Sequence, residues 1–188
     1  MKQKVVKGLL WKLLENGGAQ GVQFVIAIIL ARLLTPAQYG VVGIITIFIT
    51  IANVVVQSGF STALVQKQKA DKVDFSSVCY FDLFVALVMY GILYAAAPVI
   101  ASFYGIAELE AIVRVLSIVL FPGAVISVQT AYVSRNLEFK GLFLSTLAAS
   151  AASGVISIWM AANGFGVWAM VGQQISYYIS LMIVLFLT

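Results

Sequence analysis

The chain has 188 residues, of which 62% are hydrophobic and only 10% are charged, and its mean hydropathy is +1.06. This composition excludes an ordinary soluble domain. Lys and Arg outnumber Asp and Glu by 11 to 7, and membrane topology explains this basic excess better than nucleic-acid binding does.

Six apolar segments are long enough to cross the hydrocarbon core of a bilayer, which takes about 20 helical residues. We expect these spans at residues 10–34, 37–63, 75–103, 109–132, 142–162 and 166–187. They lack the short alternating pattern of β-barrel strands. The sequence therefore predicts an all-α polytopic membrane protein with six transmembrane helices.

The first residues combine lysines with apolar residues at helical spacing, which predicts a short interfacial helix leading into the first span. Glu15 and Asn16 interrupt its apolar stretch, so we do not expect it to be cleaved as a signal peptide. At the other end, residues 179–188 stay apolar up to Thr188. We interpret the chain as a fragment of a longer protein.

The stretch "ARLLTPAQYG" predicts a tight corner between the first two spans. Thr35 is a good N-cap, Pro36 suits the first helical position, and Gln38 is placed to complete a capping box. Because the residue before a proline is pushed out of the α region, the preceding helix should end near Leu34.

Orientation follows from the distribution of Lys and Arg. With a cytoplasmic N-terminus, nine of these residues fall on inner segments and two on outer ones, as the positive-inside rule requires. We therefore expect residues 66–74 and 134–141 to face the cytoplasm, and residues 104–108 and 163–166 to face out.

Polar side chains recur at helical spacing in three spans. They are Asn16, Gln20 and Gln23 in the first span, Thr46, Thr50, Asn53 and Gln57 in the second, and Thr146, Ser150, Ser153 and Ser157 in the fifth. Small hydroxyl residues favour a close-packing seam between helices. The amides of the first two spans are larger than packing needs, which favours a hydrated cavity lined by Asn16, Gln20, Gln23, Asn53 and Gln57.

Two further features lie at membrane depth. Asp82 is the one acid well inside a span, and it indicates either ion coupling or gating, or a structural pair with a basic residue near the inner face. The pairs Gly17-Gly18 and Pro122-Gly123 weaken their helices, which makes both candidate hinges as well as candidate static bends.

Several kinds of chemistry are excluded. The chain has no His, and Cys79 is its only Cys, so it lacks the ligands of a thiolate or imidazole zinc cluster and the base of a Ser-His-Asp or Cys-His system. We expect no metal, no cofactor and no enzymatic activity.

The ordered segments "ARLLTPAQYGVVG", "GFSTALVQKQKAD", "AAAPVIASFYGIAELEAIVRVLSI", "SRNLEFKGL" and "GFGVWAMV" resemble the start of a bacterial polysaccharide flippase. The similarity is to the O-antigen, exopolysaccharide and teichuronic acid exporters (Wzx-like flippases) of the multidrug/oligosaccharidyl-lipid/polysaccharide superfamily, and it covers nearly the whole chain. It implies two six-helix lobes around a central cavity, with residues 1–188 as one lobe and the C-terminal lobe missing.

The resemblance also implies a function in the bacterial cytoplasmic membrane. Its substrate would be an undecaprenyl-diphosphate-linked oligosaccharide, flipped to the outer leaflet by alternating access. The amides would bind sugar hydroxyls, and Lys12 at the inner mouth, or cations in the missing half, would bind the diphosphate. Membrane lipids, a polysaccharide polymerase and glycosyltransferases are the other expected partners, and nucleic acid is not one.

Two other functions remain open. A cation-coupled multidrug extruder of the same superfold would use acids and aromatics in the cavity, for which Asp82 and the tyrosines of the third span, Tyr80, Tyr90 and Tyr94, are available. A membrane scaffold in a polysaccharide assembly complex would not transport at all.

Overall fold

The computed structural model describes residues 2–57, 64, 71–136 and 139–187, with side chains from Gly17 onward except at positions 72, 136 and 139. Every regular element in these ranges is helical, which confirms the all-α prediction. The elements are α1 (Lys2–Leu33), α2 (Pro36–Val56), α4 (Lys72–Tyr104), α5 (Glu108–Leu116), η1 (Ser117–Val119), α6 (Leu120–Asn136), α7 (Phe139–Ala162) and α8 (Val167–Leu187).

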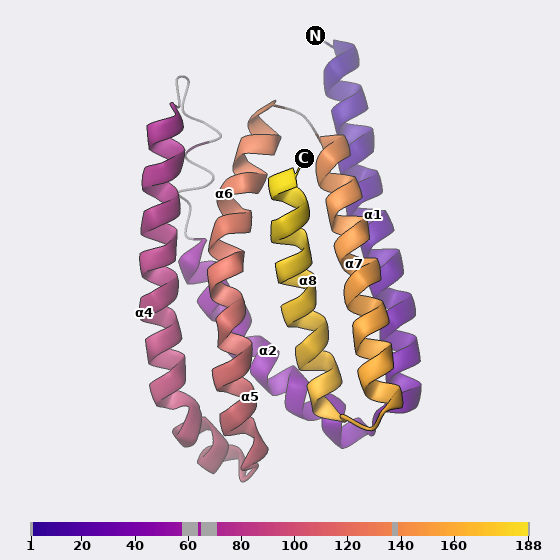
Figure 1. Cartoon of the computed structure of the whole chain (residues 1–188), viewed down its shortest axis with the longest axis vertical. Coiled ribbons are helices and arrows are strands. Elements are labelled where there is room, and N and C mark those ends of the chain that lie inside the picture. Colours follow the sequence, from indigo (N-terminus) through magenta and orange to yellow (C-terminus); the bar gives the residue numbers. More distant parts are fainter. Residues whose placement is uncertain (1, 58–63, 65–70, 137–138, 188) are drawn as a thin grey trace.

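The helices form one layered bundle (Figure 1). In this view α4 and α1 stand near opposite edges, α6, α8 and α7 lie between them, and α2 crosses behind α6 and α8. The most extensive packing joins α7 to α8 and to α1, and α4 to α5 and α6. α1 therefore belongs to the α7 side of the bundle, although it precedes α2 in the sequence.

Three tight corners join helices at one end of the bundle, and both chain termini lie at the other (Figure 1). We call these the corner end and the terminal end. The corners lie between α1 and α2, between α4 and α5, and between α7 and α8. This alternation matches the predicted grouping of loops, in which residues 104–108 and 163–166 share a face opposite to residues 134–141.

The first corner has the predicted capping box. The Thr35 backbone N–H donates to Gln38 Oε1 at 2.9 Å, and the Gln38 backbone N–H donates to Thr35 Oγ1 at 3.4 Å. The Tyr39 hydroxyl then donates to the carbonyl oxygen of Ala27 at 3.0 Å, which ties the start of α2 back onto α1. Thr35, Pro36 and Gln38 thus turn the chain with the backbone groups of the corner paired.

Five helical segments of the described chain are long and apolar enough to cross a membrane. They are Pro36–Val56, Val73–Tyr104, Glu108–Arg135, Lys140–Ala162 and Val167–Leu187. Among the described side chains, α1 contributes a shorter apolar helix, Gly17–Leu33. The chain is therefore a multi-pass membrane protein, and a sixth span through α1 remains a prediction.

Two predicted helix boundaries were wrong. α2 ends at Val56, with Gln57 as its C-cap, instead of residue 63, and the weak helix former Gly59 follows three residues later in the sequence. The interfacial helix expected before the first span is not separate, because α1 runs unbroken from Lys2 through Gly17 and Gly18. Helical hydrogen bonding along α1 outweighs the weakness of two adjacent glycines.

The predicted fourth span departs from α-helical geometry just before its proline. The 3-10 turn η1 covers Ser117–Val119, and α6 resumes at Leu120. Pro122 has no N–H to donate to the carbonyl group of Ile118, four residues earlier, and its ring crowds that group. The irregular turn therefore lies one turn before Pro122, while a hinge role for Pro122 and Gly123 stays a prediction.

The polar stripe of the fifth span forms a packing seam, as predicted. Its members Thr146, Ser150, Ser153 and Ser157 are all buried. The hydroxyl groups of Thr146, Ser153 and Ser157 donate to carbonyl oxygens of their own helix. These short side chains leave room for the close approach of α1 and α8 to α7.

Gly154 marks the tightest point of this seam, and it gives a stability prediction. A Cβ atom at Gly154 would lie 2.5 Å from Ile26 Cδ1 of α1. We therefore expect Gly154→Val to lower the free energy of unfolding by about 1–3 kcal/mol, measured by thermal denaturation in detergent. Gly21→Val is the matched control, because a Cβ at Gly21 meets nothing within 4 Å. Equal effects of the two changes would contradict close packing at Gly154.

The orientation of the bundle gives a labelling prediction. We expect a cysteine introduced at Asn163 of the corner end to react with an impermeant thiol reagent in intact cells. A cysteine introduced at Asp71 of the terminal end should react only after the membrane is permeabilised. Both positions are exposed, and a Cys79→Ser background removes the native thiol. Labelling of the Asp71 position from outside would overturn the predicted orientation.

Candidate functional site

One amide of α1, Gln23, meets α8. Gln20 is exposed, whereas Gln23 is half-buried. Gln173 of α8 donates from Nε2 to Gln23 Oε1 at 3.1 Å. The sequence predictions do not include Gln173. Its signal is the adjacent pair of amides, Gln173 and Gln174, in an otherwise apolar span.

The amides of α2 are placed differently. Asn53 is half-buried, and its Oδ1 atom is buried without a hydrogen-bond partner in the described part of the chain. A Cβ atom at Gly123 of α6 would lie 3.0 Å from Asn53 Oδ1 and 3.6 Å from Tyr178 Cε1 of α8. Gly123 is thus the point at which α2, α6 and α8 approach one another. Gln57 is exposed at the end of α2.

We call Gln20, Gln23, Asn53, Gln57 and Gln173 the amide seam. α1 and α2 diverge from their common corner (Figure 1), and each packs against α8 or its neighbour α7. The structure brings Gln23 to Gln173 and Asn53 to the α6–α8 contact, while Gln20 and Gln57 are open to the surroundings. The side chains of Asn16 and Lys12 lie outside the described residues.

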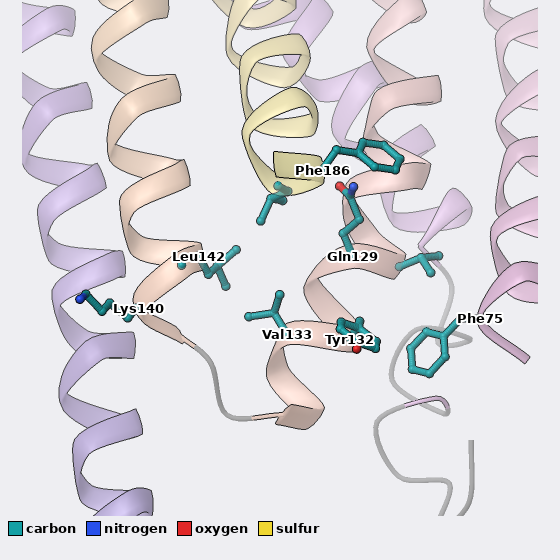
Figure 2. A pocket seen from close by; sticks show the side chains of 10 residues that line it. Phe75, Gln129, Tyr132, Val133, Lys140, Leu142 and Phe186 are labelled. Carbon is teal, nitrogen blue, oxygen red and sulfur yellow. The ribbon is translucent and has the colours of Figure 1, made fainter. Parts of the chain in front are cut away.

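A second feature lies at the terminal end, where a pocket of about 560 Å³ opens between four helices (Figure 2). We call it the terminal-end pocket. Its lining comes from α4, α6, α7 and α8: Phe75, Val128, Gln129, Tyr132, Val133, Lys140, Gly141, Leu142, Leu185 and Phe186. Most of these side chains are apolar, so its walls suit a hydrocarbon chain.

Three residues bring polar groups to the terminal-end pocket. Gln129 reaches into it beside Phe186, and its Oε1 atom is buried without a hydrogen-bond partner in the described chain (Figure 2). The Tyr132 ring packs edge-on against Phe75, with 5.5 Å between ring centroids. Lys140 is exposed on the rim, with its ammonium group turned toward α1. Apolar walls with an amide, a phenol and a cation at the edge suit an amphiphilic ligand with an anionic head group.

The sequence did not identify this pocket. The positive-inside pattern accounts for Lys140 as a topological charge, and no predicted polar stripe includes Gln129. The α4 and α8 segments of the lining lie more than 40 residues from those of α6 and α7 in the sequence, and the pocket exists because α6 and α7 make few contacts with each other while both pack on α8.

Asp82 is fully buried on α4, and neither carboxyl oxygen has a hydrogen-bond partner in the described part of the chain. The alternative expectation of a structural pair with a basic residue finds no such partner there. Among the glycines, Gly18 packs on α7, where a Cβ would lie 3.1 Å from Phe143 Cε2, whereas Gly17 is open.

Comparison with known proteins yields one family and several relatives. The family described as "Polysaccharide biosynthesis protein" matches residues 29–188. The chain is 26% identical over 169 residues to the succinoglycan biosynthesis transport protein ExoT of Rhizobium meliloti, covering 90% of this chain and 34% of that protein. It is 28% identical over 141 residues to the teichuronic acid biosynthesis protein TuaB of Bacillus subtilis, covering 74% of this chain and 29% of that protein.

An uncharacterized membrane protein in the cps region of Klebsiella pneumoniae is 22% identical over 139 residues, covering 74% of this chain and 29% of that protein. The chain therefore spans about a third of the length of the curated relatives that it matches. No solved structure matches it significantly.

Proposed function

The chain belongs to the polysaccharide biosynthesis protein family, and on that premise we propose that it is part of a flippase for an undecaprenyl-diphosphate-linked oligosaccharide. The flippase acts in the cytoplasmic membrane of a bacterium, with the terminal end of the bundle facing the cytoplasm. The names of two relatives, a succinoglycan transport protein and a teichuronic acid biosynthesis protein, support a role in polysaccharide export.

The observation that carries the proposal is the chemistry of the terminal-end pocket. An isoprenoid chain is apolar and fits walls such as Val133, Leu142 and Phe186, whereas a diphosphate needs a cation and hydrogen-bond donors near the membrane surface. Lys140 supplies the cation on a flexible stem at the rim. Gln129 and Tyr132 add amide and phenol donors on the α6 side of the pocket, across from Lys140 on α7 (Figure 2).

The amide seam supplies the second half of the substrate site. Amide groups hydrogen-bond to sugar hydroxyls without the desolvation cost of a charge. Gln20 and Gln57 are open to a ligand, and Gln23 and Gln173 are already oriented by their mutual hydrogen bond. The oligosaccharide then passes along the seam while the lipid stays at the apolar flank of the bundle.

We further propose that residues 1–188 form one six-helix lobe, with α1 as the sixth crossing helix. A second lobe in the remainder of the protein closes the cavity over the amide seam. The greater length of the curated relatives supports this arrangement. A polysaccharide polymerase and glycosyltransferases remain the predicted partners.

The tyrosines that a multidrug extruder would use do not line the terminal-end pocket. Tyr80 is 76% exposed on the outer side of α4. Tyr90 packs against Phe121, with 5.6 Å between ring centroids, and Tyr94 lies under Arg114. The positions of these tyrosines therefore do not favour the extruder over the flippase.

Transport of a lipid-linked oligosaccharide by the purified full-length protein tests this function. Proteoliposomes are loaded with a labelled substrate, and the fraction reaching the opposite leaflet is measured with an enzyme that acts only on accessible sugar. We expect Lys140→Gln to slow flipping about tenfold and Lys140→Arg to retain most of the rate, because Arg preserves the charge. Absence of flipping by the parent protein, with normal polymer in cells, would favour the scaffold function instead.

A further inference from the structure

The surroundings of Asp82 are not explained by the transport proposal. The Asp82 side chain is 0% exposed, and its two carboxyl oxygens are both buried without a hydrogen-bond partner in the described chain. An ionised carboxylate in such a place, well inside a membrane span, loses its water shell and gains nothing in return. A neutral acid avoids that cost.

No charged group in the described chain lies beside Asp82. α4 packs against α2, α5, η1 and α6. On α5, Arg114 forms an ion pair with Glu110 at 2.9 Å, and its guanidinium lies 4.4 Å from the ring centroid of Tyr94. Tyr94 is twelve residues, or about 18 Å, along α4 from Asp82, so Arg114 is remote from the carboxyl group. From α2 the one ionisable side chain is Tyr39 at the corner end, and η1 has none.

The remaining ionisable groups near this face are those of α6 and α4. Arg135 of α6 donates to the carbonyl oxygen of Leu64 at 3.0 Å, near the terminal end. Tyr132 contacts Phe75, which precedes Asp82 by seven residues, or about 10 Å. On α4 itself Cys79 lies one turn from Asp82 and brings no positive charge. Among the described residues, therefore, no counter-ion lies beside Asp82.

A proton fits this site better than a metal ion does. Cations such as Na⁺ and Ca²⁺ need several oxygen ligands around them. The described side chains contain no group of three or more His, Cys, Asp or Glu residues that could hold a metal ion. A proton needs only the carboxyl group itself.

The terminal-end pocket approaches Asp82 along one face of α4, although Asp82 itself is not part of its lining. Phe75, which lines the pocket, lies two turns from Asp82 on the same face of α4. Two ring contacts, Phe75 with Tyr132 and Tyr90 with Phe121, fix the antiparallel register of α4 and α6. That register places Asp82 level with residues 125–129 of α6. Gln129, at the end of this range, also lines the pocket.

We propose that Asp82 is a proton-binding site that exchanges its proton with water through the terminal-end pocket, so that an apolar ligand filling the pocket traps the proton. Asp82 in its COOH form releases H⁺ to water at the terminal end when the pocket is hydrated, and the carboxylate takes H⁺ up again before the pocket is refilled. The link between the proton and transport rests on the proposed function, whereas the proton site does not.

Infrared spectroscopy of the purified full-length protein in lipid vesicles tests the site without a transport assay. We expect a carbonyl band of a protonated carboxylic acid at neutral pH, which Asp82→Asn removes. Asp71→Asn is the matched control: Asp71 is exposed, Asn also serves as an N-cap, and the band should persist. In Val133→Trp, with a filled pocket, hydrogen–deuterium exchange of the band should slow at least tenfold.

Each other result overturns a defined part of the proposal. A parent protein without the band, or a band unchanged by Asp82→Asn, would show that Asp82 carries no proton. Loss of the band on adding Na⁺ at constant pH would identify a metal-cation site instead. Unchanged exchange in Val133→Trp would exclude the pocket as the route. A parent protein that shows the band but flips no substrate would contradict the proposed function and leave the proton site standing.

Discussion

The full-length protein carrying Val133→Trp is expected to reach the membrane in the parental amount and to export at least tenfold less polysaccharide. Val133 is half-buried on α6 and lines the terminal-end pocket. An indole ring there takes up space that the isoprenoid chain of the substrate needs, while it buries apolar surface and so does not oppose folding. A tenfold loss of export corresponds to about 1.4 kcal/mol of lost interaction between substrate and protein. Complete exclusion of the apolar chain from the pocket should cost more than this, so tenfold is the smallest effect that we expect.

The matched control is Leu144→Trp. Leu144 lies on α7 close to the pocket in sequence, but it is 49% exposed and does not line the pocket. The same ring at that position should leave export unchanged. Polymer at the cell surface, normalised to folded protein in the membrane, is the measurement. Parental export by Val133→Trp, with its fold intact, would show that the pocket does not take part in transport.

Most of the helical framework could be predicted from local sequence. Four of the predicted spans end within a few residues of the helices α4, α5–η1–α6, α7 and α8, because an apolar run of this length can satisfy its backbone in a membrane only as a helix. The corner at Thr35 and Pro36 was predictable as well, since a capping box involves only neighbours in the chain.

The features that the sequence predictions missed depend either on the balance between hydropathy and helix propensity or on contacts between helices that are distant in the sequence. α2 stops at Val56, seven residues before the predicted end, because average hydropathy over a window does not register a single weak helix former such as Gly59. The α1–α7 pairing cannot be read from the order of helices. It decides that a Cβ atom at Gly18 would meet Phe143, whereas one at Gly17 would meet nothing within 4 Å.

The candidate site divides in the same way. Periodicity identified Gln20, Gln23, Asn53 and Gln57 as polar stripes, because that property belongs to one helix at a time. It did not identify Gln173 as the partner of Gln23, or the terminal-end pocket, because both require knowledge of which helices meet. Asp82 was singled out by its depth, but only the structure shows that it is buried without a hydrogen-bond partner among the described residues.

Simultaneous replacement of the four predicted amides, Gln20, Gln23, Asn53 and Gln57, by Leu in the full-length protein is the second change from which we expect a large effect. If these side chains bind sugar hydroxyls, each contributes about 0.5–1.5 kcal/mol net, so four losses together reach roughly 2–6 kcal/mol. Export should then fall by well over tenfold, while single changes stay mild. The measurement is again surface polymer per folded protein.

The structure supplies internal controls for this experiment, because the four amides differ in their surroundings. Asn53→Leu removes a buried oxygen that has no hydrogen-bond partner in the described chain, so this change alone should not destabilise the fold by loss of a hydrogen bond. Gln23→Leu leaves Gln173 without its 3.1 Å partner, so it should lower stability, and adding Gln173→Leu should recover part of the loss. Gln20 and Gln57 are exposed, so their replacement should not destabilise the bundle. A quadruple variant that folds and exports at the parental rate would exclude the amide seam from the substrate path. A loss of stability that accounts for the whole loss of export would show that the amides are packing elements.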